Sequence, residues 1–497
     1  MIDSGDKMLK VEEIRSFIDA DKSSDRKRLA KVGMNYYAGK HDIEKYRIFF
    51  VDADGKLKED KTRSNIRISH PFFKILADQE AQYILSGKEP LFNSDIPELQ
   101  SRLDEYFNNN DDFNSELYYA VVGAIVKGFD YFYAYKNSKG QTCFQCADSL
   151  GVVEVRENET DDHCKYVIYH YVDRISKQEE PITRIEVWDD KTITFYIQEG
   201  AGEINRDKKK EHNPRPHILY KKEGDNATYF EDFGQIPFIR LENGKKQESG
   251  LLPIKDLIDS YDLMNSGLSN NIEDTNESLY VVKGFEGDNL DELMMNIKAK
   301  KHIGVGEDGD VEIKTIDIPV EARRTKMETD EKNIFRFGMG VNTEALKDTS
   351  ATVSVAIKSA YANLDLKCEG FNKGFKRFLR KLLDLVLKEI NELDGTAYEQ
   401  KDVYFNLERE TITNEHEKAQ IRLVEAQEQQ TRITTILNTA AQFGNELTMQ
   451  MLCEAYDLDY DELKSKFPDP EENNDIYAAQ SALDAVVVED PGGGVIE

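Results

Sequence analysis

The sequence predicts an α+β protein that is mainly helical, with one antiparallel β region in its first half. Two observations support this prediction. Over most of the chain apolar residues recur every three or four positions, which is the period of one helix face. Between residues 130 and 242 the period changes to two, in short β-branched and aromatic segments such as CKYVIYHYV, and this pattern is typical of antiparallel strands.

The N-terminal quarter is predicted to be helical. Residues 1–46 carry an apolar stripe and close with KVGMNYYAGKHDI. After a charged turn, ISHPFFKILADQEAQYILSGKEP predicts one helix that begins at Pro71, where a missing N–H costs nothing, and that stops at Gly87. Residues 97–127 give two more helical patterns. The segment 130–242 follows and is interpreted as an antiparallel meander.

The second half is predicted to consist of long helices around one small insert. A helix runs from Leu251 to about Ser278, and an α/β insert with two strand-like ends and a short helix occupies 279–318. The next helix begins at Pro319 and continues to Gly338. The insert therefore lies between two helices of similar length.

A polar segment, 339–352, separates that helix from a long one over about 352–393. A further amphipathic helix is predicted for 413–444 and a short helical pair for 446–467. The tail, 468–497, is acidic with a glycine run and is predicted to be mobile.

Composition limits the classes of function. The 497 residues carry a formal net charge of −30, from 65 bases and 95 acids, which argues against a broad basic surface that grips nucleic acid. No run approaches the ~20 apolar residues of a membrane helix, and the first residues lack the apolar stretch of a signal peptide. Five scattered cysteines are too few for a disulfide framework. We expect a cytoplasmic product.

Motifs for catalysis or metal binding are incomplete. GxxxxGK[ST], HExxH and GxSxG do not occur. Cys143, Cys146, His163 and Cys164 have zinc-like spacing, but residues three apart on a strand point to opposite faces, so plain strand cysteines are favoured. Asp457, Asp459 and Asp461 resemble half a calcium loop, yet a glutamate stands where that loop needs glycine. We predict no enzyme activity, no cofactor and no metal.

The order of the segments resembles one known family. In sequence, the chain has YYAGKHDI, RISHPFFKILADQEAQYILSGKEP, a β region, IPFIRLENG, a long helix, a small α/β insert, a helix, a polar loop and VAIK at the start of a long helix. This order is similar to that of the portal proteins of tailed double-stranded DNA phages, in the branch typified by long-tailed phages of Gram-positive bacteria. The resemblance spans about Asn35 to Phe467. Each motif is weak alone, and the ordered set is specific.

One departure from the family concerns the polar loop. The family commonly has a Ser-Gly pair just before the VALK-like helix start, whereas this chain has Val353 and Ser354 before VAIK. Valine is stiff where glycine would be free, so the hinge of the loop is expected to differ.

The resemblance implies a portal-protein fold in a ring, usually dodecameric, at one capsid vertex. Its implied parts are the wing (1–250 and 353–411, the latter with a kinked long helix and a strand), two stem helices (251–278 and 319–338), the clip (279–318), the tunnel loop (339–352), the crown (412–467) and an acidic tail (468–497).

The same resemblance implies the function and the partners. Double-stranded DNA would pass through the channel during packaging and ejection. The terminase large subunit and a head-completion or adaptor protein would dock on the ring, and the scaffold and major capsid proteins would contact it. The protein would be part of the virion after assembly in the host cytoplasm, with no membrane partner.

Candidate site residues follow from the implied channel. The tunnel-loop side chains are short, polar and of mixed sign: Asn342, Thr343, Glu344, Lys347, Asp348, Thr349 and Ser350. Lys332 and Arg336 are candidate channel bases, with ordinary ion pairs as the alternative. Lys298, Lys300 and Lys301 in the clip are candidate contacts for partner proteins, with a solvated cluster as the alternative.

Two other functions stay open from the sequence. A monomeric helical adaptor or minor head protein would fail to form rings at high concentration. A DNA-processing enzyme is favoured least, because neither a metal-binding carboxylate set nor a phosphate loop is visible. Magnesium-dependent DNA cleavage or ATP hydrolysis by the purified chain would support it.

Overall fold

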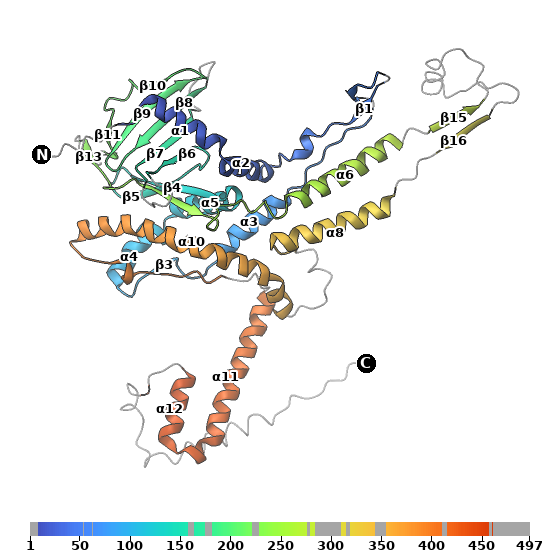
Figure 1. Ribbon diagram of the computed structural model, residues 1–497. Helices are drawn as coiled ribbons and strands as arrows, with labels where there is room; N and C mark the ends of the chain where they lie inside the picture. Colours follow the sequence, from blue (N-terminus) through green and yellow to red (C-terminus); the bar gives the residue numbers. More distant parts are fainter. Residues whose placement is uncertain are drawn as a thin grey trace, which may run out of the picture. The chain divides into compact units, whose positions relative to one another are not determined.

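The chain forms two compact units (Figure 1), one of residues 1–350 and 358–411 and the other of residues 351–357 and 412–497. The computed structural model describes residues 8–52, 54–61, 63–157, 164–173, 181–220, 228–275, 279–283, 310–314, 319–342, 354–409, 415–456 and 460. Within these ranges, no helix has the length and apolar character needed to cross a lipid bilayer.

The helices of the first unit follow the predicted order closely. They are α1 (Val11–Ser23), α2 (Asp25–Tyr37), η1 (Asp42–Lys45), α3 (Phe72–Ile84), α4 (Pro97–Leu103), η2 (Asp104–Asn108), α5 (Asp111–Lys127), α6 (Lys255–Thr275), α8 (Val320–Gly338), α10 (Ser354–Asp394) and η4 (Gln400–Asp402). Pro71 and Pro319 stand at the N-caps of α3 and α8, as predicted. Helix α3 ends at Ile84, ahead of the predicted stop at Gly87.

Polar caps and one glycine explain the ends of α2 and α5. The side chain of Ser24 accepts a hydrogen bond from the Lys27 N–H at the start of α2, and Asn110 accepts one from Phe113 at the start of α5. Helix α5 ends at Gly128, whose φ of 92° lies in the left-handed region. A Cβ at this position would also lie 2.2 Å from the Gln247 carbonyl oxygen.

The strand region forms more than one sheet, so the prediction of a single meander is wrong. Strands β6 (Val152–Val155), β7 (Tyr166–Val172), β8 (Ile182–Trp188), β9 (Thr192–Glu199) and β10 (Ile204–Arg206) form an antiparallel meander, and β11 (Arg215–Pro216) pairs with β9. A second sheet has the order β14–β4–β5, from Phe238–Glu242, Phe129–Lys136 and Thr142–Ala147. Period-two patterns reveal strands but not which distant strand closes a sheet, and β14 returns to pair with β4.

Four small antiparallel pairs complete the β structure: β1 (Phe49–Val51) with β2 (Leu57–Glu59), β3 (Phe92–Asn93) with β17 (Tyr404–Phe405), β12 (Ile218–Tyr220) with β13 (Tyr229–Glu231), and β15 (Leu279–Lys283) with β16 (Asp310–Lys314). The last pair confirms the two strand-like ends predicted for the insert. The short helix predicted between them lies outside the described residues.

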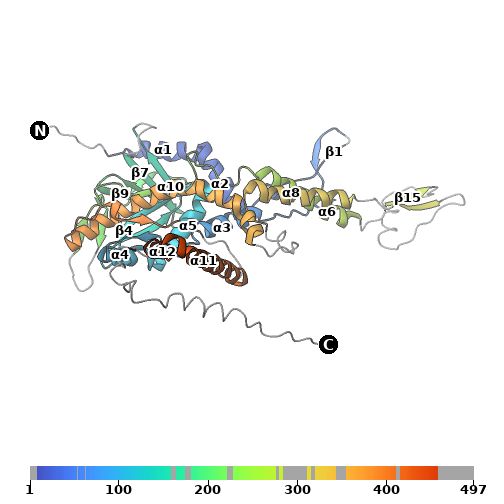
Figure 2. The same ribbon diagram turned by 90° about the horizontal axis from the view of Figure 1, so that it is seen from below.

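The core of the first unit lies between helices and the two sheets. Ile14 and Ile18 of α1 pack on the meander, in a cluster with Val153 and Ile168. Helix α10 runs along the three-stranded sheet (Figure 2). The ring centroids of Phe378 on α10 and Phe132 on β4 are 5.2 Å apart. Burying each large apolar side chain contributes about 1.5–3 kcal/mol, so these contacts hold α10 in place.

A buried carboxylate also fixes the position of α10. Glu389 is 6% exposed and accepts hydrogen bonds from the Thr142 N–H at 3.1 Å and from the Tyr106 hydroxyl at 2.7 Å. The Thr142 hydroxyl donates to it as well. The end of α10 is thereby joined to β5 and to η2.

The second unit is described through two helices. Helix α11 spans Glu415–Phe443 and α12 spans Asn445–Ala455, and both were predicted. They meet at Gly444, which has a φ of 78°. The rest of the predicted short pair, to residue 467, lies outside the described residues apart from residue 460.

Candidate functional site

Helices α6 and α8 pack side by side, and the chain between them contains the predicted insert (Figures 1 and 2). Their contact is partly polar, because the Ser260 hydroxyl donates to Asp330 Oδ2 at 3.0 Å and Lys326 pairs with the same carboxylate. Asp330 is almost fully buried, and so are Ile258 and Ile334 on the same two helices. The Lys326–Asp330 pair lies within α8, so the hydrogen bond from Ser260 and the buried apolar side chains are the contacts that join the two helices.

An extended segment, 64–70, is bound along α6 by a repeating set of hydrogen bonds. Every second backbone N–H of the segment donates to a side chain on every fourth residue of the helix: His70 to Asp262 (3.0 Å), Ile68 to Ser266 (3.0 Å), Ile66 to Asn270 (2.6 Å) and Ser64 to Asp274 (3.1 Å). Four helical residues rise about 6.0 Å and two extended residues about 6.6 Å. The two periods match, so the segment follows α6 from Asp262 to Asp274.

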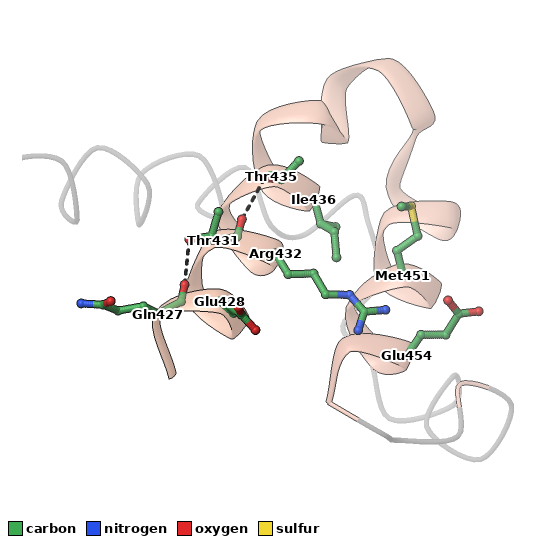
Figure 3. Close-up of a pocket in the computed structure, with 8 residues that line it drawn as sticks. All are labelled: Gln427, Glu428, Thr431, Arg432, Thr435, Ile436, Met451 and Glu454. Carbon is green, nitrogen blue, oxygen red and sulfur yellow. Dashed lines mark hydrogen bonds between the residues drawn. The ribbon is translucent and has the colours of Figure 1, made fainter. Parts of the chain in front are cut away.

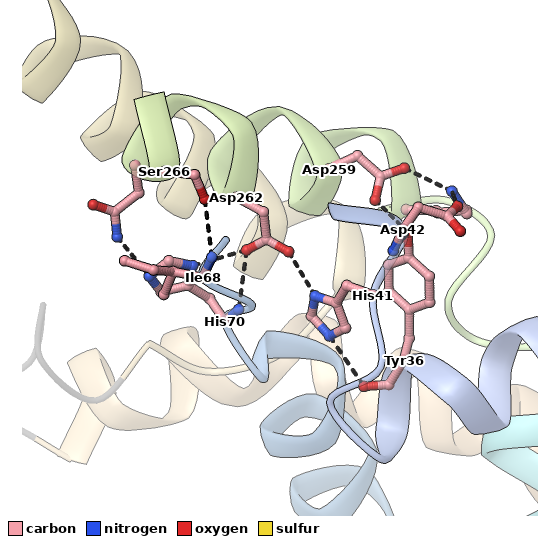
Figure 4. A network of polar contacts seen from close by, with 10 residues as sticks. Tyr36, His41, Asp42, Ile68, His70, Asp259, Asp262 and Ser266 are labelled. Atoms are coloured by element: carbon pink, nitrogen blue, oxygen red, sulfur yellow. Dashed lines mark hydrogen bonds and ion pairs between the residues drawn. The ribbon is translucent and has the colours of Figure 1, made fainter. Parts of the chain in front are cut away.

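Asp262 lies at one end of this ladder and joins three parts of the chain (Figure 4). Its carboxylate has 0% exposure and lies 2.6 Å from His41 Nδ1 and 2.8 Å from His70 Nδ1. His41 Nε2 lies 3.2 Å from the Tyr36 carbonyl oxygen. Both ring nitrogens of His41 therefore lie within hydrogen-bond distance of an oxygen atom. The arrangement is a buried polar contact between α6 and the residues that follow α2.

Burial alone would raise the pKa of Asp262, but hydrogen bonds from His41 and His70 outweigh it and hold the pKa below its ordinary value. A carboxyl with a depressed folded pKa stabilises the fold above its unfolded pKa of about 3.9 and loses that contribution as the pH falls through the folded pKa. We expect the stability advantage of the wild type over Asp262→Asn to be full at neutral pH and to shrink below about pH 4. Melting temperatures of both proteins across this range test it, and a constant difference would contradict the assignment.

A second polar cluster lies one helical turn earlier on α6 (Figure 4). The Tyr36 hydroxyl donates to Asp259, and Lys255 pairs with Asp259 at 2.6 Å and with Asp42 at 2.8 Å. Hydrogen bonds from Lys255 and Lys45 lower the pKa of Asp42 to about 2. Both clusters therefore hold α6 to the segment after α2, one through buried groups and one through partly exposed groups.

The polar loop begins at a tightly held segment. Gln79 of α3 contacts both backbone groups of Val341, because its Nε2 donates to the carbonyl oxygen at 3.2 Å and its Oε1 accepts from the N–H at 2.8 Å. Met339 ends α8 with a φ of 56°. Gly340 follows, and a Cβ there would lie 2.1 Å from Leu76 Cδ2 of α3. The start of the loop is thus packed against α3.

Lys367 of α10 completes this junction. Its Nζ donates to the Gly338 carbonyl oxygen at 2.9 Å and lies 2.8 Å from Glu80 Oε2. Glu80 is 1% exposed, and neither carboxylate oxygen accepts a hydrogen bond of good geometry from a described residue. Lys367 is therefore the charge that balances Glu80, and one side chain joins α3, α8 and α10.

The second unit has a groove of about 590 Å³ between α11 and α12 (Figure 3), lined by Gln427, Glu428, Thr431, Arg432, Thr435, Ile436, Met451 and Glu454. Arg432 points toward Met451 and Glu454 across the groove. The hydroxyls of Thr431 and Thr435 donate to carbonyl oxygens of their own helix, at 2.7 Å and 2.8 Å. Both hydroxyls are therefore engaged with the backbone of α11.

Comparison with known proteins identifies the family of the chain. The family model described as phage portal protein, SPP1 Gp6-like, matches residues 15–445. The chain belongs to this family. It is 27% identical over 392 residues to the portal protein of Bacillus phage SPP1, an alignment that covers 78% of this chain and 75% of the relative. It is 24% identical over 430 residues to the portal protein of Clostridium phage phiCD119, covering 83% and 89%.

Family membership confirms the resemblance found in the sequence, and both relatives come from phages of Gram-positive hosts. The function is that of a phage portal protein, located at the portal vertex of the virion capsid. Portal proteins are structural components of the phage rather than enzymes. The family implies a capsid-associated ring through which DNA passes and on which the terminase acts.

The candidate channel residues are only partly covered by the described ranges. Lys332 and Arg336 are exposed on α8, and neither forms an ion pair with a described residue. Arg336 lies 6.0 Å from the centroid of the Phe337 ring. Asn342 Nδ2 donates to Glu331 Oε1 at 3.4 Å. The other tunnel-loop candidates, Thr343, Glu344, Lys347, Asp348, Thr349 and Ser350, and the clip candidates, Lys298, Lys300 and Lys301, lie outside the described residues.

The cysteines of the zinc-like pattern are free thiols. Burial raises the pKa of Cys146 and, to about 11, that of Cys164, which disfavours the thiolate form that a metal requires. Over the part of the chain that the structure describes, no group of three or more His, Cys, Asp or Glu side chains is arranged to hold a metal ion. The half calcium loop at Asp457, Asp459 and Asp461 lies outside that part.

Sequence reasoning missed the groups that position α6 and the loop. Asp262, Ser266, Asn270 and Asp274 recur at every fourth position, a polar stripe along α6 that signals a polar partner. His41 and His70 stand inside YYAGKHDI and RISHPFF, the two motifs that carried the family resemblance. No local pattern identifies Gln79 or Lys367, because their partners lie on distant segments.

Proposed function

We propose that this chain forms the portal ring, with twelve subunits in the virion, and that α6 and α8 are the stem helices of its channel. The segment 339–352 is the tunnel loop, 279–318 the clip, 412–467 the crown, and 1–250 with 353–411 the wing. Support comes from the family match and from the paired helices, which the ladder along α6 ties to the N-terminal segment of the chain. The chain itself catalyses no reaction.

The observation that carries the loop assignment is the junction at Val341. Gln79 holds both backbone groups of this residue, and Lys367 holds Gly338, so the loop starts from a rigid point between α8 and α10. A loop on such a base presents its side chains to DNA without moving the helices. Because these side chains are short and of mixed sign, their contacts with phosphates are weak and leave no deep binding minimum.

The negative charge of the ring favours movement of DNA through the channel over tight binding of DNA. Twelve subunits carry a formal charge of 12 × −30 = −360, and duplex DNA carries one negative charge per ~1.7 Å of axis. A wall of the same sign does not hold the duplex, and a few bases such as Lys332, Arg336 and Lys347 moderate the repulsion locally. The duplex therefore slides along the channel while the ATPase motor supplies the energy.

Each partner protein is assigned to one part of the ring. The terminase large subunit and, later, the head-completion or adaptor protein dock on the clip, where Lys298, Lys300 and Lys301 are the candidate contacts. The scaffold and major capsid proteins contact the ring during assembly. The mass of the purified chain in solution distinguishes the portal ring from a monomeric adaptor. Light scattering should give the mass of about a dozen subunits if the portal proposal is right and the mass of one subunit if the chain is an adaptor.

Deletion of residues 342–350 tests the loop. We expect rings to form normally, because the contacts of Val341, Gly338 and α6 remain, and we expect DNA packaging by proheads that carry the variant to be strongly impaired. Packaging is measured as DNase-protected DNA, and ring formation by negative-stain electron microscopy.

A matched control replaces the same nine residues by glycine and serine, which keeps the length of the loop and removes its side chains. If the deletion packages as much DNA as the wild type, the tunnel-loop role is wrong. If the control packages normally and the deletion does not, length alone matters and the proposed role of the individual side chains is wrong.

A further inference from the structure

Helix α10 has a strongly basic outer face. Six exposed bases lie on its second half: Lys373, Lys376, Arg377, Arg380, Lys381 and Lys388. At 100° per residue they fall within an arc of roughly 140°, over roughly 22 Å of helix. The opposite face is buried and apolar, with Phe375, Phe378 and Leu382 at 0–1% exposure. The helix is thus amphipathic, with packing on one side and positive charge on the other.

The bases of this face form no ion pairs within the described structure, although Arg377 and Lys381 line a pocket together with Glu154 and Glu242. None of the six bases forms an ion pair with a described residue, whereas Lys367 and Arg409 in the same unit are paired with carboxylates. The sequence has no acid between Glu369 and Asp384. The chain as a whole has a net charge of −30, so this cluster of bases without described ion pairs is a local region of opposite charge. Such a positive surface indicates an anionic partner.

The composition of the face favours DNA over a protein partner. Four of its six bases are lysines, and lysine is depleted at protein–protein interfaces, where aromatic residues and arginine are enriched. Lysine and arginine are together the residues that position a protein on phosphates. A row of bases along a helix also suits a linear polyanion, and a portal protein handles duplex DNA.

We propose that the basic face of α10 contacts the phosphates of duplex DNA without regard to base sequence. This inference rests on the proposed function, which brings DNA to the ring. The contact uses other residues than those of the tunnel loop, which ends at residue 352. It gives the acidic ring one surface that attracts DNA, while the loop lets DNA pass.

The test compares two variants that remove the same charge. The first carries Lys376→Gln, Arg377→Gln, Arg380→Gln and Lys381→Gln on α10. The control carries Lys31→Gln, Lys191→Gln, Lys208→Gln and Lys209→Gln, four exposed lysines on other elements than α10. Fluorescence anisotropy of a short labelled duplex is titrated with wild-type and variant rings between about 50 and 200 mM salt. Melting temperature and mass by light scattering are measured for all three proteins.

We expect the α10 variant to bind the duplex more weakly for every base sequence. Its plot of log affinity against log salt should be less steep by about one for each phosphate that the variant no longer neutralises. The control should bind like the wild type. These results together would support a phosphate-binding face that does not read the base sequence.

Three results would overturn the proposal. The first is equal binding of the duplex by both variants. The second is a loss of rings in the α10 variant alone, since that outcome makes the face a contact between subunits. The third is wild-type rings that bind no duplex, which would leave the channel function standing, because packaging tests that function separately.

Discussion

Replacement of Asp262 by alanine is expected to lower the free energy of unfolding by about 3 kcal/mol, because each buried donor left without an acceptor costs about 1–3 kcal/mol. The substitution leaves the His41 and His70 rings and the His70 N–H without their common acceptor, a carboxylate of 0% exposure. It also removes one end of the ladder that binds segment 64–70 to α6. Urea unfolding of the wild type and the variant measures the change.

Glu273→Ala is the matched control, because Glu273 is an exposed acid on the same helix and takes no part in the ladder. Its effect should stay within about 0.5 kcal/mol, as for ordinary surface substitutions. A similar, small loss in both variants would show that the Asp262 carboxylate does not hold α6 in place. A large loss in Asp262→Ala with normal ring formation would show that the ladder stabilises the subunit rather than the assembly.

Replacement of Lys367 by methionine is the second substitution with a large expected effect. It leaves the Glu80 carboxylate, 1% exposed, without its balancing charge, and it removes the donor to the Gly338 carbonyl. We expect a loss of about 3–5 kcal/mol in the free energy of unfolding, since an uncompensated buried charge is costly. Thermal or urea unfolding measures it.

The double variant Glu80→Gln with Lys367→Met serves as the control. Removing both charges leaves no buried charge, so the double variant should recover most of the stability that Lys367→Met loses. Additive losses in the two single variants would contradict a direct interaction between Glu80 and Lys367. Packaging assays on the double variant then separate stability from function, because the subunit folds while the Gly338 carbonyl still lacks its donor.

The two sites hold different parts of the paired helices. Asp262 and its neighbours bind α6 to the segment after α2, and Glu80 with Gln79 binds the end of α8 to α3. Both therefore attach the helix pair to the N-terminal helices, independently of any neighbouring subunit. This explains how one subunit presents a helix pair and a loop base that are already positioned before a ring forms.

The sequence by itself determined the elements and the family. Helical and strand periods are local properties, so α3, α6, α8, α10 and α11 were predicted close to their observed bounds. Proline at the N-caps of α3 and α8 indicated where these two helices begin, because the preference of proline for a helix start is also a local property. The order of these elements, together with the motifs around His41 and His70, carried the resemblance that the family match confirmed.

Only the tertiary structure decided which distant groups meet. Strand β14 pairs with β4 across about a hundred residues, Asp262 joins two histidines about two hundred residues earlier, and Gln79 reaches Val341 over a separation of 262 residues. No periodicity encodes these partners, because each depends on how the whole chain closes on itself. The same applies to the bases of α10, because which acids lie near them is visible only when the neighbouring elements are in place.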